Sequence, residues 1–209
     1  MPADNPDFLL TPATVPTLLQ RNALRLLQWM GWHVHFKPLP GPRGVIIVYP
    51  HTSNWDFVVG LLAKWAVGIQ VRWLGKETLF TGAGGFFLGG LLRRLGGQPV
   101  VRGASTGAIE RLAQSMQAAD WYWLALAPEG TREYRPGWRS GFYHIAREAG
   151  VPIAVAYIDY ATRIVGVIDH IEPSGDLDGD MQKIRAAYAG RQGLHPELAS
   201  PIVVPPPPK

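Results

Sequence analysis

Short apolar runs alternate with helical patterns along this chain, and this alternation restricts its fold more than any other feature. Val45 to Val48 and Trp121 to Ala127 are typical of buried strands, because each run is apolar and too short for an ordinary helix. Each run leads into a polar turn and then into a segment with helical character. Strands that alternate with helices are typical of α/β domains. We therefore predict a single α/β domain with a mixed, mostly parallel sheet flanked by helices.

The 209 residues suffice for one domain with a sizeable core. We expect an irregular arm at 1–16, an amphipathic helical segment at 17–36, the main domain at 37–200 and a Pro-rich tail at 201–209. The amino end has acids and prolines where a signal peptide has a basic region. No run reaches the ~18 apolar residues of a membrane-spanning helix. We predict neither a signal peptide nor a transmembrane helix.

The composition excludes some chemistry and favours other chemistry. Without cysteine, the chain can form no disulfide, thiolate nucleophile or cysteine-ligated zinc site. A formal net charge of +4 favours an anionic partner, such as a nucleic acid, a membrane surface or a phosphorylated substrate. Eight tryptophans favour a membrane interface or a large binding surface.

The segment from Thr17 to about Trp32 has the spacing of an amphipathic helix, with Arg21 and Arg25 on its polar side. Two interpretations stay open, and both can hold on different faces. The helix packs on the domain, or it lies in the bilayer interface, where the arginines meet lipid phosphates and Trp29 sits at headgroup depth. The predicted apolar side consists of Leu18, Leu19, Ala23, Leu26, Leu27 and Met30.

An apolar, glycine-rich stretch runs from Leu79 to Leu92 and ends at the basic pair Arg93 and Arg94. It is too short to span a membrane and, with its glycines, a poor isolated helix. One interpretation is close packing against other backbone. We favour the other, an apolar surface that meets acyl chains.

His51 and Asp56 lie five residues apart, where a predicted strand ends and a predicted helix begins. An imidazole held by a carboxylate is suited to accept a proton, because the carboxylate fixes its tautomer and stabilises the imidazolium. The alternative is that Ser53 and Asn54 cap the helix and that Asp56 is a first-turn acid favoured by the helix dipole.

Two more loops follow predicted strands, one at Arg102 and one at Glu129 to Arg132. Ligands of open α/β sheets bind beyond the carboxyl ends of the strands, so we expect these loops and the His51 loop to line one cleft. Arg102 and Arg132, with Lys76 as a third cation, suit a phosphate group.

Gly130 would allow close approach of the backbone to a ligand, and Thr131 would add a hydroxyl donor. The alternative for the segment from Glu129 to Arg132 is a capped turn with an internal ion pair. His33 and His35 share one face of a short predicted strand. No third ligand is suggested near them, so we expect ordinary strand histidines and no metal site.

Four blocks together resemble the glycerophospholipid acyltransferase family, typified by the lysophosphatidate acyltransferases. The segment from His51 to Asp56 matches the H-x-S-x-x-D form of the family's first motif, and Pro128 to Arg132 matches its P-E-G-T-R motif. Lys76, together with residues 86–89 and 100–103, looks like the family's second block. Residues 151–156 are similar to its fourth block. The resemblance covers roughly residues 45 to 159.

The resemblance implies that His51 is a general base and Asp56 its partner. It further implies that Lys76, Arg102 and Arg132 hold the phosphate of the acceptor. The remaining residues of the third motif, Glu129, Gly130 and Thr131, would shape the same substrate pocket.

The implied reaction moves an acyl chain from acyl-CoA or acyl-carrier protein to a lyso-lipid hydroxyl, such as that of 1-acylglycerol-3-phosphate. No cofactor beyond the donor substrate is implied. The implied partners are the lyso-lipid, the donor and a membrane surface, without nucleic acid, and the implied location is peripheral, on the cytoplasmic face of the membrane. Pro50 stands where the family commonly has Asn, and the chain is shorter than many members. These departures leave the acceptor open, including an amino-acid-linked lyso-lipid.

Two rival functions remain. A non-enzymatic basic module that binds membranes or nucleic acid fits the charge and the tryptophans, but it leaves both motifs unexplained. The sequence also has no helix-turn-helix or aromatic RNA-binding signature. A serine hydrolase that uses Ser53 is disfavoured, because the chain has no G-x-S-x-G elbow and Ser53 lies too close to His51.

Overall fold

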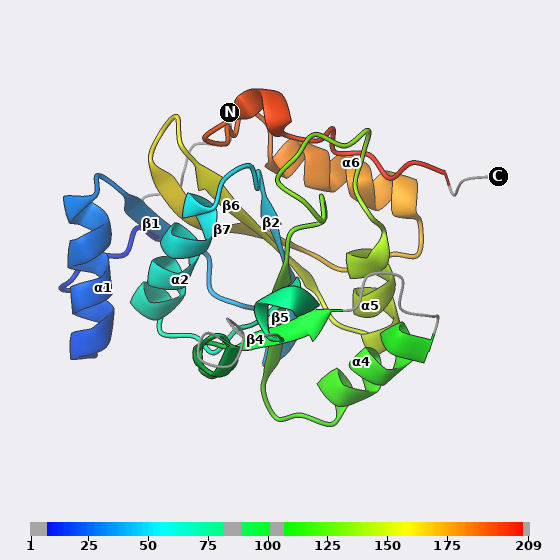
Figure 1. Ribbon diagram of the computed structural model, residues 1–209, viewed down its shortest axis with the longest axis horizontal. Coiled ribbons are helices and arrows are strands. Elements are labelled where there is room, and N and C mark those ends of the chain that lie inside the picture. Colours follow the sequence, from blue (N-terminus) through cyan, green and yellow to red (C-terminus); the bar gives the residue numbers. More distant parts are fainter. Residues whose placement is uncertain (1–7, 82–88, 101–106, 207–209) are drawn as a thin grey trace.

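The structure is a computed structural model that describes residues 8–81, 89–100 and 107–206 (Figure 1). Its centre is a seven-stranded sheet in the order β1-β7-β6-β2-β5-β3-β4, in which β6 and β7 pair antiparallel and the other neighbours pair parallel. The predicted mixed, mostly parallel sheet is confirmed. The strands are β1 (His33–Phe36), β2 (Arg43–Tyr49), β3 (Arg72–Lys76), β4 (Gly97–Val100), β5 (Tyr122–Leu126), β6 (Ile153–Asp159) and β7 (Ile164–Ile171).

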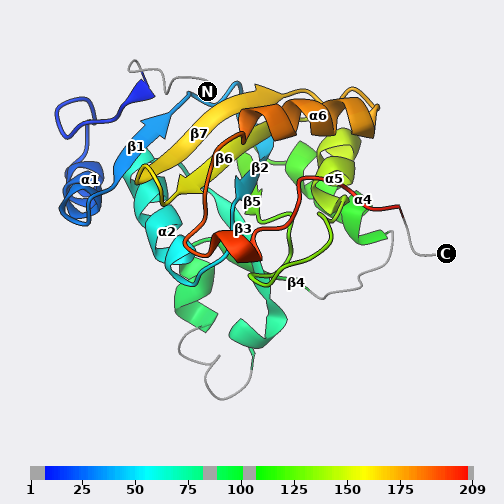
Figure 2. The same cartoon turned by 90° about the horizontal axis from the view of Figure 1, so that it is seen from above.

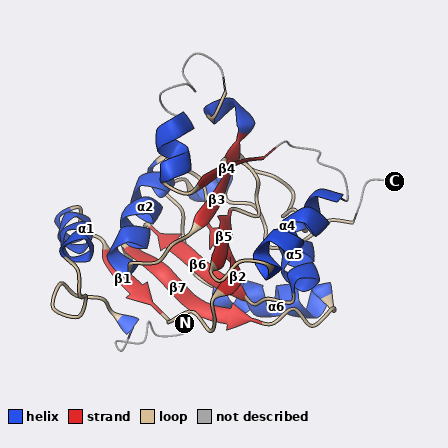
Figure 3. Cartoon of the chain, turned by 90° about the horizontal axis from the view of Figure 1, so that it is seen from below, coloured by secondary structure: helices blue, strands red, loops and turns tan. Residues whose placement is uncertain are grey.

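Helices cover both faces of the sheet, which gives three layers (Figures 2 and 3). One face carries α1 (Leu18–Trp29) and α2 (Trp55–Val67), and the other carries α4 (Gly107–Gln117), α5 (Gly141–Ala149) and α6 (Leu177–Ala187). Residues 89–94 are also helical. Two short 3-10 helices are η2 (Glu77–Leu79) and η3 (Pro196–Leu198).

The central strands are apolar on both sides because both sides are covered. In β2, Val45 and Ile47 belong to the core under α4, α5 and α6, whereas Ile46 and Val48 pack on the opposite face. Every residue of β6 is buried. Strands buried on both faces are expected to be continuous apolar runs, which explains why such runs marked them in the sequence.

Five strands point their carboxyl ends to the same edge of the sheet, because β2, β3, β4, β5 and β6 run parallel to one another. The loops after β2, β5 and β6 therefore meet at this edge. It is the edge at which ligands of open α/β sheets bind.

Helix α1 packs on the domain with only part of its predicted apolar side. Ala23, Leu24 and Leu27 are buried against α2, whereas Leu18 and Leu19 are more than half exposed. Of the predicted apolar side, Ala23 and Leu27 thus pack on the domain, whereas Leu18, Leu19 and Leu26 do not. These three and Trp29 form the outer apolar face of α1, with exposed fractions of 67%, 59%, 43% and 83%.

A buried glutamine explains this orientation. The side-chain amide of Gln20 donates to the carbonyl oxygens of Ala66 (3.4 Å) and Val67 (3.1 Å). These are among the last carbonyls of α2, which lack partners within their own helix. Gly68 ends α2 in the left-handed conformation with φ +79°, as its position in the sequence predicted.

Candidate active site

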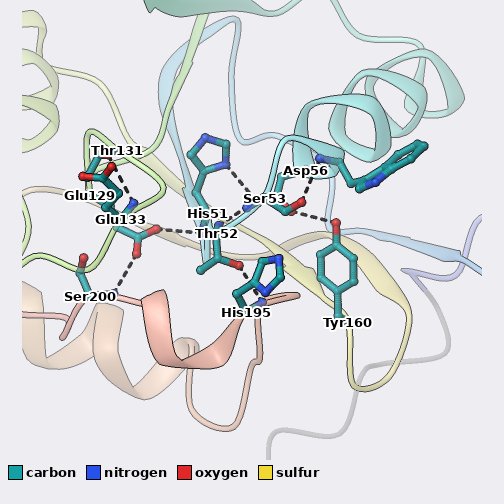
Figure 4. A network of polar contacts seen from close by, with 11 residues as sticks. His51, Thr52, Ser53, Asp56, Glu129, Thr131, Glu133, Tyr160, His195 and Ser200 are labelled. Carbon is teal, nitrogen blue, oxygen red and sulfur yellow. Dashed lines mark hydrogen bonds and ion pairs between the residues drawn. The ribbon is translucent and has the colours of Figure 1, made fainter.

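His51 and Asp56 form a close pair at the carboxyl edge of the sheet (Figure 4). β2 ends at Tyr49 and α2 begins at Trp55, so the chain reverses between the two side chains. His51 Nδ1 lies 3.1 Å from Asp56 Oδ2. The Asp56 side chain is 1% exposed and that of His51 is 22% exposed. The carboxylate is thus shielded, while the imidazole reaches the surface.

The loop is wrapped around the Asp56 carboxylate. Oδ2 accepts hydrogen bonds from the backbone N–H groups of Thr52 (2.8 Å) and Ser53 (2.9 Å). Asp56 also lies in the first turn of α2, where the helix dipole favours a negative charge. Asp56 is therefore both a first-turn acid of α2 and the partner of His51. Asn54 occupies the N-cap position without a side-chain cap, and the Ser53 hydroxyl accepts from Trp55 N at 3.1 Å.

This geometry determines which ring nitrogen is available. Because Nδ1 lies 3.1 Å from the carboxylate, the neutral tautomer that carries its proton on Nδ1 is favoured, and its lone pair is then on Nε2. An imidazole backed by a buried carboxylate can accept a proton from a hydroxyl on Nε2, and the carboxylate of Asp56 stabilises the resulting imidazolium.

Glu129, in the loop after the neighbouring strand β5, holds the His51 loop through a hydrogen bond. Its buried carboxylate accepts hydrogen bonds from the backbone N–H of His51 on Oε2 (2.7 Å) and of Ser200 on Oε1 (2.9 Å). Burial raises the pKa of Glu129, and the two backbone donors oppose that shift. The pKa of Tyr49 is raised to about 12 by burial and by the charge of Glu129. Both Glu129 oxygens thus have backbone partners.

After Glu129, the third motif forms a turn that is half-buried at Gly130 and Thr131 and exposed at Arg132. Gly130 has φ +69° and donates its N–H to Ala127 O at 3.0 Å, a conformation that favours glycine. The Thr131 hydroxyl accepts from Glu133 N at 3.3 Å. Arg132 is exposed, and the predicted alternative of an ion pair between Glu129 and Arg132 is absent from the described part of the chain.

Of the other predicted cations, Lys76 is exposed at the carboxyl end of β3 and therefore at the same sheet edge as His51. Arg102 lies outside the described residues. Across residues 8–81, 89–100 and 107–206, no three His, Asp or Glu side chains are grouped so that they could hold a metal ion.

Two hollows lie outside the His51 and Asp56 pair. One of about 340 Å³ adjoins the Glu129 clamp, and Tyr49, Tyr134 and Ser200 are among its lining residues. Another of about 520 Å³ lies toward the opposite edge of the sheet, beside Lys64 and Trp121. The His51 loop and the loop of the third motif meet through the hydrogen bond of His51 N to Glu129, and neither of these hollows includes the imidazole. The predicted cleft with the Arg102 loop stays a prediction, because residues 101–106 lie outside the described residues.

Two residues that sequence reasoning missed also contact this site. The Tyr160 hydroxyl donates to Asp56 Oδ1 at 2.9 Å, and the backbone N–H of His195 donates to the Thr52 hydroxyl at 3.2 Å. Burial and the hydrogen bond to Asp56 raise the pKa of Tyr160.

With the geometry established, comparison with known proteins identifies the family. A family model described as Acyltransferase matches residues 13–159. The chain belongs to the Acyltransferase family. No curated protein matches this acyltransferase-family chain at a significant level.

Among solved structures, the chain is similar to the 1-acyl-sn-glycerophosphate (LPA) acyltransferase PlsC from Thermotoga maritima. The match has 18% sequence identity and a TM-score of 0.51, and it covers 80% of this chain and 74% of PlsC. At this identity the likeness concerns the fold. It confirms an α/β domain of the PlsC type.

Several contacts to the site come from beyond the part that matches the acyltransferase-family model, which ends at Asp159. Tyr160, His195 and Ser200 all follow it and contact the first or third motif. Tyr160 could have been predicted as a site residue, because it directly follows a predicted strand and so lies at the carboxyl edge of the sheet. Ser200 and His195 act through backbone N–H groups, which every residue except proline has, so their sequence carried no such signal.

Proposed function

We propose that this protein is an O-acyltransferase that moves a fatty acyl chain from an acyl thioester to the hydroxyl of a lyso-lipid, with His51 as the general base. The observation that carries the proposal is the 3.1 Å contact between His51 Nδ1 and the buried Asp56 carboxylate, in a chain of the Acyltransferase family. The His51 side chain is 22% exposed, so a substrate can reach the imidazole from the surface.

In the proposed reaction, His51 Nε2 accepts the proton of the acceptor hydroxyl while the hydroxyl oxygen attacks the thioester carbonyl. The tetrahedral intermediate collapses, the carbon–sulfur bond breaks, and the imidazolium returns its proton to the departing thiolate. The products are the acyl ester and the free thiol. A positioned base of this kind contributes roughly 10²–10⁴-fold to the rate. Acyl-CoA and acyl-carrier protein are both suitable donors, and no further cofactor is required.

A phosphate-bearing acceptor such as 1-acylglycerol-3-phosphate is the acceptor that we favour. Arg132 and Lys76 are exposed at the carboxyl edge, and Arg102 belongs to the same proposed phosphate site. Arg135 and Arg139 add two more exposed guanidinium groups to the loop after β5. Within the described part of the chain, none of the three arginines of this loop forms an ion pair, so their charge is available to an anion.

We further propose that the outer apolar face of α1, defined by Leu18, Leu19, Leu26 and Trp29, rests on a membrane surface. Arg25 is exposed on the same helix, where it can meet lipid phosphates. Among the described residues, no helix combines the length and the apolar character needed to cross a membrane. The proposed attachment is therefore peripheral, on the cytoplasmic face where acyl-CoA and acyl-carrier protein are supplied.

The test is an acyl-transfer assay with labelled acyl-CoA and labelled acyl-carrier protein against a panel of phosphate-bearing and amino-acid-linked lyso-lipids. His51→Ala is expected to lower transfer at least about 100-fold while its circular dichroism spectrum stays unchanged. His144→Ala, which removes an exposed histidine from α5, is the control. Undiminished transfer by His51→Ala would refute the mechanism.

Asp56→Asn tests the second half of the pair. The amide keeps the shape of the side chain but no longer favours the Nδ1–H tautomer, and we expect a loss of about 10³-fold or more in kcat. Asp178→Asn is a closely matched control, because Asp178 is an exposed acid at the same position of the first turn of α6. Equal activity of the two variants would contradict the assigned role of Asp56.

A further inference from the structure

The Asp56 carboxylate is held at both of its oxygens, from two different parts of the chain. Oδ2 accepts from the N–H groups of Thr52 and Ser53 and contacts the imidazole of His51. Oδ1 accepts from the Tyr160 hydroxyl at 2.9 Å. Tyr160 is the single hydrogen-bond donor to Oδ1 in the part of the chain that the structure describes, and Figure 4 shows its ring directed at the carboxylate.

Topology places Tyr160 there. β6 and β2 are parallel neighbours, so the turn after β6 and the loop after β2 lie at the same edge of the sheet. Tyr160 is the first residue after β6, and Asp56 follows β2 by one short loop. The two residues are 104 positions apart in sequence, yet they lie in contact because they follow adjacent parallel strands.

The backbone at Tyr160 is fixed by a buried acid. Asp159 is 1% exposed, and its carboxylate accepts from Ala161 N (3.1 Å), the Thr162 hydroxyl (2.8 Å) and Gln192 N (3.2 Å). The N–H of Tyr160 itself donates to Gln192 O at 2.8 Å. The turn therefore has little freedom to carry the tyrosine away from the dyad.

The ring of Tyr160 is also confined. Trp32 meets it edge to face, with ring centroids 4.9 Å apart, and the guanidinium of Arg163 lies 5.9 Å from the Tyr160 centroid and 5.5 Å from that of Trp32. A ring held on these sides presents its hydroxyl in one direction, which is toward Asp56. Contacts of this kind are what preorganise a supporting side chain.

We propose that Tyr160 is a positioning residue for the His51 and Asp56 pair: its hydroxyl stops rotation of the Asp56 carboxylate, so that Oδ2 stays directed at His51 Nδ1. The inference rests on the proposed function only for the catalytic use of the pair. Its structural content is independent of the substrate, because it concerns which imidazole nitrogen carries the proton. A carboxylate anchored at both oxygens selects the Nδ1–H tautomer more strongly than one anchored at a single oxygen.

Tyr160→Phe removes the hydroxyl and keeps the ring beside Trp32 and Arg163. A matched control is available in Tyr143→Phe. The Tyr143 hydroxyl also donates to a buried aspartate, Asp180 Oδ2, at the same 2.9 Å, but it joins α5 to α6 away from the dyad. Both variants lose one tyrosine–carboxylate hydrogen bond, and only Tyr160→Phe loses it at Asp56.

Two measurements on the full chain separate the outcomes. In the transfer assay, we expect Tyr160→Phe to lower kcat about fivefold to tenfold with KM changed less than about twofold, and Tyr143→Phe to keep the wild-type kcat. Without any substrate, ¹⁵N chemical shifts of the His51 imidazole report its tautomer. We expect the Nδ1–H fraction to fall in Tyr160→Phe and to stay at the wild-type value in Tyr143→Phe.

The inference is overturned if the two variants lose equal activity, since the hydrogen bond would then matter only to general stability. It is also overturned if the Nδ1–H fraction of Tyr160→Phe equals that of the wild type. Absence of transfer by the wild-type protein on every acceptor would refute the proposed function instead, and the tautomer measurement would still decide the role of Tyr160.

Discussion

The carboxylate of Glu129 accepts a hydrogen bond from the backbone N–H of His51 at 2.7 Å, so the third motif holds the first motif in place. The same carboxylate accepts from Ser200 N at 2.9 Å. Glu129 is thus the centre of a clamp that joins the loop after β2, the loop after β5 and the segment that follows α6.

Replacing this carboxylate with an amide is expected to loosen the clamp. Glu129→Gln keeps one acceptor oxygen and presents an NH₂ group to a backbone N–H, so one of the two donors loses its partner. We expect kcat to fall about tenfold or more and the melting temperature to drop by several degrees. Steady-state kinetics and calorimetry measure both. Glu133→Gln, in an exposed position of the same loop, should change neither, and similar behaviour of the two variants would contradict the clamp.

Recognition of phosphate predicts a selective effect of Arg132→Ala. An exposed guanidinium can bind two phosphate oxygens, and its loss should raise KM for a phosphate-bearing acceptor about tenfold or more. A phosphate-free acceptor should lose less than about threefold. Arg147→Ala, which removes an exposed arginine from α5, is the control. Equal losses for both kinds of acceptor would argue against phosphate binding at Arg132.

Docking of the outer apolar face of α1 predicts weaker membrane binding when Leu18, Leu26 and Trp29 all become Ser. Co-sedimentation with vesicles that contain anionic lipid should decrease about tenfold or more, because the apolar area available for burial is removed. The exposed Gln28→Ser on the same helix controls for reduced helix propensity. Unchanged sedimentation of the triple variant would leave α1 as a packing element only.

The buried carboxylate of Asp180, which lies away from the His51 and Asp56 pair, makes the stability of the fold depend on pH in the acidic range. Burial alone would raise its pKa, but hydrogen bonds from Lys183, Ser174 and Tyr143 outweigh burial and lower the pKa of Asp180 to about 2. Since the pKa in the folded state lies below the ordinary value of 3.8, the carboxylate stabilises the fold above that pH, and this contribution is lost as pH falls toward 2.

Asp180→Asn should therefore lower the melting temperature by about 5 °C near neutral pH, and the gap to the wild type should shrink as the pH falls from 3.8 toward 2. Thermal scans across this range measure the gap. The exposed Asp178→Asn in the same helix should show no such trend. A gap that stays constant with pH would contradict the assignment.

The fold was predictable where neighbouring residues decide it. The apolar run before Tyr49, the helix that ends at Gly68 and the helix that ends at Gly150 are set by local patterns, and the structure has them. The pairing of His51 with Asp56 also needs only one short loop.

What the sequence did not reveal depends on contacts between distant segments. Apolar residues lie on two sides of α1, and the side that packs, with Ala23, Leu24 and Leu27, is also the side on which Gln20 bonds to the end of α2. The choice between the two sides depends on these contacts with α2. The carboxylate of Glu129 meets backbone N–H groups, whereas its motif suggested substrate contact. The predicted role of Arg102 stays a prediction, because the residue lies outside the described ranges.

The sequence separation of these contacts has a consequence for how the protein folds. The hydrogen bonds that fix the site join residues 78, 71, 104 and 143 positions apart. Contacts of such long range must overcome the entropy of closing large loops, and chains rich in them fold slowly. We therefore expect the helices to form before the imidazole reaches its final environment, which also needs the long-range pairing of β2 with β5 and β6. Competence for catalysis is then among the last properties that the folding chain acquires.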